Sequence, residues 1–272
     1  MTYTTLISPA ELAQCNNVKI LDCRAALGDP ERGARLYQEG HIPDAVYLSL
    51  DHDLAAAPGE RGRHPLPDPQ ALAGRLQQLG INDEDQVVVY DDAGGAFAAR
   101  AWWCLRWLGH ETVALLDGGL LAWQGDLTTS TPAPQRGNFS IRPSLTRTID
   151  VTELSQPNDN RILVDARSEA RFAGREEPND PVAGHIPGAV CLPFQGNLDS
   201  TGRFRSRAEL RDRFSGAASA ADTVCYCGSG VTAAHNILAL KVAGYPEPLL
   251  YPGSWSEWIV APEREIATDE QA

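Results

Sequence analysis

A possible nucleophile lies near the C-terminal end of the chain, in a loop that suits an anion. Cys227 follows the apolar run Thr223–Tyr226 and opens the stretch CGSGVTA, after which a helix-like pattern runs to Ala243. A glycine-rich turn between a strand and a helix can point backbone N–H groups inward, and the helix N-terminus adds partial positive charge. Such surroundings lower a thiol pKa from about 8.5 into or below the neutral range. The pattern predicts a reactive thiolate at Cys227.

The residues after Cys227 are expected to hold negative charge through their backbone N–H groups. They are Gly228, Ser229, Gly230, Val231 and Thr232. Glycine is expected at positions 228 and 230 because side chains there would block the cradle or exclude its backbone angles.

Three other interpretations of this cysteine have to be compared with a nucleophile. Free cysteines are often inert and buried, and the six cysteines at positions 15, 23, 104, 191, 225 and 227 show no disulfide-framework spacing. Cys225 and Cys227 resemble half of a zinc site, but no second ligand pair has suitable spacing. A cysteine phosphatase needs an arginine six residues after its nucleophile, where this chain has Ala233. We therefore expect a nucleophilic cysteine without a metal.

The elements that must position this loop occur twice in the chain. ILDCRA at residues 20–25 recurs as LVDARS at residues 163–168, and GHIPDAVYL at residue 40 recurs as GHIPGAVCL at residue 184. Each copy begins with a helix-start signal, SPAEL or DVTEL, and then alternates apolar strands with helices. This alternation predicts an α/β fold with a parallel sheet covered by helices on both faces, present as two tandem domains.

The repeat also predicts the domain boundaries. We expect a first domain at residues 1–123, an extended linker at 124–149, which is rich in Thr, Pro and Gly, and a second domain at 150–272. Aligned back from Trp123 and Trp258, the copies place Asp92 opposite Cys227. The first domain would then lack a nucleophile.

Composition excludes some classes of function. The chain has 272 residues, 43% of them hydrophobic and 22% charged, and a formal net charge of −13. A negative field disfavours nucleic acids and anionic membranes as partners. No stretch approaches a membrane span and the N-terminal residues lack a signal-peptide pattern, so we expect a cytoplasmic protein without membrane contact.

These motifs together resemble the rhodanese superfamily of sulfurtransferases. The likeness rests on two tandem repeats with GHIPGA-like turns, on CGSGVTA, and on the following GSWSEW, and it covers nearly the whole chain. It implies two tandem rhodanese-like domains, with the first one inactive. CGSGVTA resembles the loop of 3-mercaptopyruvate sulfurtransferases, because thiosulfate-using rhodaneses carry basic residues directly after the cysteine. Gly228 and Ser229 leave this loop without a cationic side chain.

The resemblance implies three partners for Cys227. Ser229 matches a loop serine that works with a histidine and an aspartate of the first domain, which fall at His64 and Asp51. A histidine of near-neutral pKa could move the donor thiol's proton through the serine. His52 is the competing histidine. Considered without the resemblance, the composition around His64, a Gly, Arg and Pro-rich loop, favours a solvated surface histidine, and Asp51 is an ordinary candidate for a helix cap.

The resemblance also implies arginines that bind the donor's carboxylate. Arg171 in ARFAGREEP takes the position of one of them, although a surface arginine on a helix has the same appearance. The second arginine of mercaptopyruvate enzymes falls at Asp180, and Arg175 is a candidate to replace it. This departure favours a thiosulfate-type enzyme, whereas the loop favours mercaptopyruvate.

The expected function is a ping-pong sulfur transfer. A small-molecule donor, 3-mercaptopyruvate, would leave a persulfide on Cys227, and a thiol such as thioredoxin or a small thiol, or cyanide in an assay, would remove the sulfur. No metal or organic cofactor is required. Two alternatives stay open: thiosulfate as the main donor, and a non-catalytic persulfide carrier or interaction module.

Overall fold

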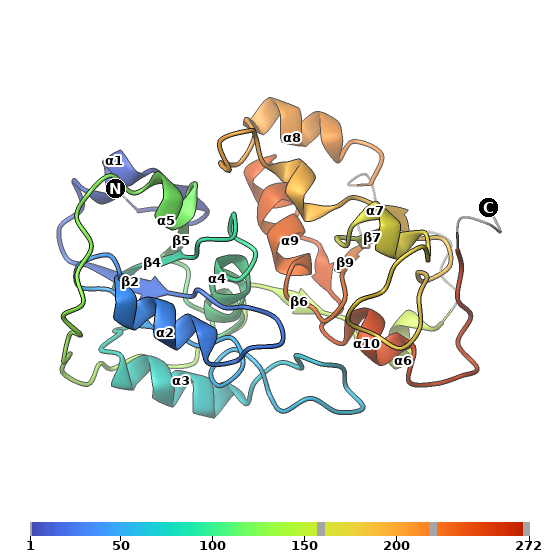
Figure 1. Cartoon of the computed structure of the whole chain (residues 1–272), viewed down its shortest axis with the longest axis horizontal. Helices are drawn as coiled ribbons and strands as arrows, with labels where there is room; N and C mark the ends of the chain where they lie inside the picture. The colour runs from blue at the N-terminus through green and yellow to red at the C-terminus, as the bar shows by residue number, and fades with distance from the viewer. Residues whose placement is uncertain (1, 157–160, 218–221, 269–272) are drawn as a thin grey trace. The chain divides into compact units, whose positions relative to one another are not determined.

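The chain forms two compact units (Figure 1). The structure is a computed structural model that describes residues 2–156, 161–217 and 222–268. The first unit contains the residues up to Ala56, Leu66–Thr146 and Ser200–Arg203. The second contains Ala57–Pro65, Arg147–Asp199 and the residues from Phe204 onward. No helix in the described part of the chain is long and apolar enough to cross a membrane.

The first unit is a parallel sheet with helices. Its strands are β1 (Leu6–Ile7), β2 (Val18–Asp22), β3 (Val46–Tyr47), β4 (Gln86–Tyr90) and β5 (Val113–Leu116), in the order β1-β5-β4-β2-β3. Its helices are α1 (Pro9–Leu12), α2 (Arg32–Glu39), α3 (Pro69–Gln78), α4 (Ala98–Trp107) and α5 (Gly119–Ala122).

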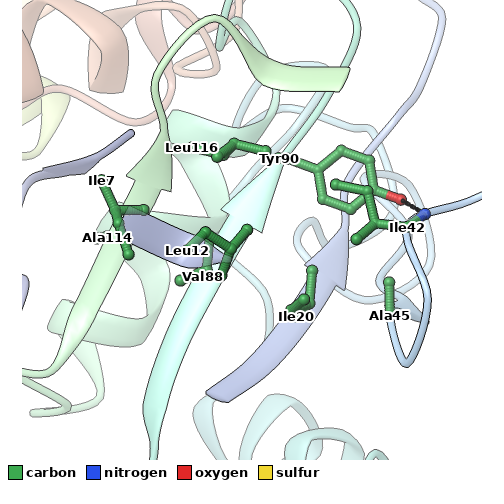
Figure 2. Close-up of a cluster of buried hydrophobic side chains, with 9 residues drawn as sticks. All are labelled: Ile7, Leu12, Ile20, Ile42, Ala45, Val88, Tyr90, Ala114 and Leu116. Atoms are coloured by element: carbon green, nitrogen blue, oxygen red, sulfur yellow. Dashed lines mark hydrogen bonds between the residues drawn. The ribbon is translucent and has the colours of Figure 1, made fainter. Parts of the chain in front are cut away.

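Both faces of this sheet are buried. On one face Val88, Tyr90 and their neighbours pack against Leu12 of α1 and against Ile42 (Figure 2). The Tyr90 hydroxyl accepts a hydrogen bond from the Ile42 backbone N–H at 3.2 Å, which ties the loop after α2 to the end of β4. Successive strand residues point to opposite faces, so Val87 and its alternate neighbours face the other side, where α4 packs on β4 and β5. The expected two-faced cover is confirmed.

The second unit repeats this topology. Its strands are β6 (Arg147–Thr148), β7 (Ile162–Asp165), β8 (Val190–Cys191), β9 (Thr223–Tyr226) and β10 (Leu249–Leu250), in the order β6-β10-β9-β7-β8. Its helices are α6 (Val151–Leu154), α7 (Glu169–Phe172), the 3₁₀ helix η1 (Phe194–Asn197), α8 (Arg207–Arg213), α9 (Ala233–Val242) and α10 (Ser254–Trp258). Both strand orders are the same when each strand of the first sheet is matched to its counterpart in the second, so the duplication extends to the fold.

The two helix-start signals behave as the sequence predicts. The Ser8 side chain accepts a hydrogen bond from the Glu11 backbone N–H at 3.3 Å, and the Asp150 carboxylate accepts one from the Glu153 N–H at 2.9 Å. Each bond satisfies an N–H group that the first helical turn leaves unpaired.

Most of the segment expected as a linker is part of the first unit. The backbone N–H groups of Gly137 and Phe139 donate to the carbonyls of Gln77 and Ile81, at 2.8 and 3.2 Å, and the Phe139 side chain is buried. A chain without regular structure needs partners for its backbone polar groups, and here the first unit supplies them. Residues 124–146 therefore belong to the first unit and are not a free tether.

Strand register corrects the residue that replaces the nucleophile. Tyr90 pairs with Asp22 in the first sheet as Tyr226 pairs with Asp165 in the second. The residue that follows the tyrosine is Asp91 in one copy and Cys227 in the other, so Asp91, and not Asp92, occupies the cysteine position. The count from the closing tryptophans failed because the first copy has one residue more between the strand and its tryptophan.

Candidate active site

Cys227 begins the turn that joins β9 to α9. Its side chain is buried, with 2% of the residue exposed. Gly230, later in the turn, has φ +75°, and a Cβ built on it would lie 2.3 Å from the Pro252 carbonyl oxygen. Residue 230 must therefore be glycine both for its backbone angle and for its close approach to the neighbouring chain.

The start of α10 supports the turn from outside. The backbone N–H of Trp255 donates to the Cys227 carbonyl at 3.0 Å, and that of Ser256 donates to the Gly228 carbonyl at 2.9 Å. The Ser254 hydroxyl accepts from the Cys227 N–H at 3.1 Å and donates to the Tyr251 carbonyl at 2.9 Å. These bonds hold the backbone of the turn in one orientation.

The matching turn of the first unit surrounds the side chain of its own first residue, Asp91. The buried carboxylate of Asp91 accepts hydrogen bonds from the backbone N–H groups of Ala93, Gly95, Phe97 and Ala98, at 2.8 to 2.9 Å. Burial raises the pKa of Asp91, and the four N–H groups oppose that rise. The turn of this fold can therefore surround a negative side chain at its first position with backbone donors.

His64 and Ser229 lie together. His64 belongs to residues 57–65, which pack within the second unit although they come from the first half of the chain. Its Nδ1 lies 2.8 Å from the Ser229 Oγ, and both residues are buried. Asp51 lies in the first unit and is partly exposed. The competing His52 is exposed in the first unit, where its hydrogen bond to Glu31 raises its pKa.

Two guanidinium groups lie against Gly228. A Cβ built on Gly228 would be 2.9 Å from Arg63 Nη2, and 3.1 and 3.4 Å from Nη2 and Nη1 of Arg171. Both side chains are largely buried, with 27% and 15% of their surface exposed. The expectation that the loop lacks cations is correct for its own side chains, but tertiary structure places two cations beside it.

Buried carboxylates hold these arginines in place. Glu177 accepts from Arg171 Nε and Nη2, the latter at 2.6 Å, and from Arg167 Nη1 at 3.2 Å. Asp180 accepts from Arg171 Nη2 at 3.3 Å and from Arg63 Nη1. Because buried carboxylates are costly without partners, the network fixes where the guanidinium groups lie.

The sequence left two of these residues unassigned. The only feature of the sequence that could have pointed to Arg63 is its position directly before His64. Ser254 lies in the GSWSEW segment and belongs to no motif of its own. The predicted candidate Arg175 is an exposed residue after α7, and the groups nearest to a Gly228 Cβ are those of Arg63 and Arg171.

Cys225, two residues before Cys227, is a poor candidate for the nucleophile. Cys225 lies inside β9, and burial raises its pKa, so it stays a neutral thiol. Within the described ranges, no group of three or more Cys, His, Asp and Glu residues could hold a metal ion.

Comparison with known proteins identifies the family. The Rhodanese-like domain pattern matches residues 9–126 and 150–261. A Pseudomonas aeruginosa protein named "Probable 3-mercaptopyruvate sulfurtransferase" is 51% identical over 264 residues, covering 92% of each chain. A Mycobacterium tuberculosis protein named "Putative thiosulfate sulfurtransferase SseB" is 40% identical over 278 residues, covering 96% of each chain.

A solved structure agrees with these relatives. The crystal structure of SseA from Escherichia coli, a 3-mercaptopyruvate sulfotransferase, has a TM-score of 0.81 and 33% identity, and covers 94% of this chain and 100% of that one. The chain belongs to the rhodanese family. It is an enzyme, a sulfurtransferase, and it therefore acts on a small-molecule sulfur donor and a sulfur acceptor.

Proposed function

We propose that this sulfurtransferase takes sulfur from 3-mercaptopyruvate and carries it as a persulfide on Cys227. The relatives from P. aeruginosa and E. coli carry the name of this activity. The observation that carries the proposal is the 2.8 Å contact between His64 Nδ1 and Ser229 Oγ. It supports the proposal because a histidine–serine pair can transfer a proton and Ser229 follows Cys227 by two residues.

In the first half-reaction the Cys227 thiolate attacks the sulfur of 3-mercaptopyruvate. A sulfur–sulfur bond forms, the carbon–sulfur bond breaks, and its electron pair becomes the enolate of pyruvate. Protonation of the enolate carbon releases pyruvate and leaves the cysteine persulfide. The reaction requires no external oxidant, because the donor itself is reduced at carbon.

The proton moves through His64 and Ser229. With Nδ1 unprotonated, His64 accepts the hydrogen bond of the Ser229 hydroxyl, and the hydroxyl oxygen can then take the donor thiol's proton. The same pair returns a proton to the enolate.

The turn and the arginine hold the donor and the sulfur. The backbone N–H groups of residues 228–232 would stabilise the anionic sulfur, as the matching turn stabilises Asp91. Arg171 lies beside Gly228 and would bind the donor's carboxylate through a planar pair of N–H groups.

In the second half-reaction an acceptor thiol attacks the outer persulfide sulfur and restores Cys227. The acceptor would be a reduced thioredoxin or a small thiol, and kinetics would be ping-pong. None of the six cysteines forms a disulfide bond, which suits a cytoplasmic enzyme in a reducing compartment.

Thiosulfate is the second candidate donor. It is favoured by the two guanidinium groups beside Gly228, since a dianion needs two positive charges, and by the name of the M. tuberculosis relative.

Steady-state rates with both donors, measured with the same acceptor, test the proposal. We expect the higher kcat/KM with 3-mercaptopyruvate, and mass spectrometry after donor treatment should find one added sulfur on Cys227. A higher kcat/KM with thiosulfate would transfer the assignment to the second candidate. No turnover with either donor would remove both.

A further inference from the structure

Arg63 is held beside the Cys227 loop by its backbone as well as by its side chain. Its N–H donates to the Ser256 Oγ at 3.1 Å, at the start of α10. The preceding Gly62 has φ +97°, and a Cβ there would lie 2.7 Å from the Gly253 carbonyl oxygen. Only glycine allows this close approach, which fixes the direction in which Arg63 leaves the chain.

The two terminal nitrogens of the Arg63 guanidinium have different neighbours. Nη1 contacts Asp180 and donates to the Asn179 carbonyl at 3.3 Å. Nη2 lies 2.9 Å from the position that a Gly228 Cβ would take. Among the residues that the structure describes, no hydrogen bond engages Arg63 Nη2 or Arg171 Nη1. Both groups therefore keep donors available beside Gly228.

Charge explains why both arginines are needed. Asp180 and Glu177 are buried, each with 3% of its side chain exposed, and together they neutralise much of the charge of Arg63 and Arg171. Neither arginine alone retains a full positive charge toward the loop. A carboxylate is therefore bound most strongly where it accepts hydrogen bonds from both guanidinium groups at once.

We propose that Arg63 is a substrate-binding residue that completes, with Arg171, the site for the donor's carboxylate. Asp180 is its positioning residue: it stands where a second arginine was expected from the resemblance, and it holds the arginine that another part of the chain supplies. The inference rests on the proposed function in that it takes the donor to be an α-keto carboxylate.

The test compares Arg63→Gln with Arg61→Gln in the full-length chain. Arg61 lies in the same segment and is exposed, so it is a matched control. We expect Arg63→Gln to raise KM for 3-mercaptopyruvate by about ten- to a hundredfold, with a smaller change in kcat, because one charged hydrogen-bond pair is lost. Arg61→Gln should match the unmodified enzyme.

A second readout needs no sulfur transfer. Iodoacetate and iodoacetamide both alkylate reactive thiols, and we expect both to modify Cys227. Only iodoacetate carries a carboxylate, so the ratio of their inactivation rates measures the attraction of anions to the site. Arg63→Gln should lower this ratio and Arg61→Gln should not. If the unmodified enzyme fails to use 3-mercaptopyruvate while Arg63→Gln still lowers the ratio, the proposed donor is wrong and the carboxylate site stands.

Exchanging the charges of Arg63 and Asp180 tests whether a loss of donor affinity comes from the broken ion pair or from failure to fold. Arg63→Asp alone should abolish most donor affinity, and Arg63→Asp combined with Asp180→Arg should restore part of it, because the pair is rebuilt with the cation on the other side. The proposal is overturned if Arg63→Gln leaves KM and the alkylation ratio at their Arg61→Gln values, or if KM changes while the ratio does not. It is also overturned if the double variant, folded by circular dichroism, recovers no affinity over Arg63→Asp.

Discussion

Asp91 and Cys227 occupy the same place in the two copies of the fold. Each follows the last residue of the strand that runs into the turn, and each has its carbonyl held by the N–H of the helix that follows the next strand, Leu120 at 2.8 Å and Trp255 at 3.0 Å. One turn encloses the Asp91 carboxyl group and the other the Cys227 thiol. The hydrogen bonds of the first copy thus indicate that this turn can stabilise negative charge on the side chain at its first position.

Cys227→Ser should lose the added sulfur and all donor turnover, because a hydroxyl cannot replace the thiolate. Cys225→Ser is the matched control: burial raises the pKa of Cys225, so its thiol stays neutral, and turnover should be retained. Intact-protein and peptide mass spectrometry after donor treatment checks both variants. Sulfur on Cys225 of an active Cys227→Ser enzyme would contradict the assignment.

His64→Ala should lower kcat with 3-mercaptopyruvate by about a hundredfold, the usual contribution of a general acid–base. Alkylation of Cys227 by iodoacetamide should continue, since the turn remains. His52→Ala is the control, because His52 is exposed and bound to Glu31, and its turnover should be unchanged. Single-turnover release of pyruvate measures the effect. Equal rates in the two variants would remove His64 from the proton path.

Gly228→Ala should raise KM for the donor, because the new Cβ would lie 2.9 Å from Arg63 Nη2 and 3.1 Å from Arg171 Nη2, and both flexible ends must move. We expect an increase of about tenfold, as for one weakened charged contact. Gly74→Ala is the control: it lies in α3 with no atom within 4 Å of its Cβ position, so activity should persist while stability rises by about 1 kcal/mol. Steady-state kinetics and urea denaturation measure the two effects.

Two substitutions of Ser254 should separate the effect of backbone strain on stability from the effect of its hydrogen bonds. It has φ +53°, an angle that disfavours side chains, and its hydroxyl bonds the Cys227 N–H. Ser254→Ala keeps the strain and leaves that buried N–H without a partner, at a cost of about 1–3 kcal/mol. Ser254→Gly loses the same bond but relieves about 1 kcal/mol of strain. Urea denaturation should rank stability as Ser, then Gly, then Ala; Ala at or above Gly would contradict the strain.

Patterns that repeat or that act within a few residues could be predicted from the sequence. The duplicated α/β fold follows from matching segments and alternating periods, and the helix starts at Ser8 and Asp150 from local hydrogen bonding. The turn around Cys227 is local in part, since Gly230 adopts a positive φ that its own residue type allows. The domain ranges are harder to predict, because the sequence does not show that residues 57–65 pack within the second unit.

The sequence by itself determined the family resemblance, the duplicated sheet and the candidate nucleophile, because these depend on residue type and short spacing. Tertiary structure alone decided which cations lie beside Gly228, the residue that follows Cys227. Gly228 and Arg63 are far apart in the chain, and their contact depends on the ion pair with Asp180 and on the backbone bond to Ser256. Such contacts follow from how separate segments pack, and no local pattern encodes them.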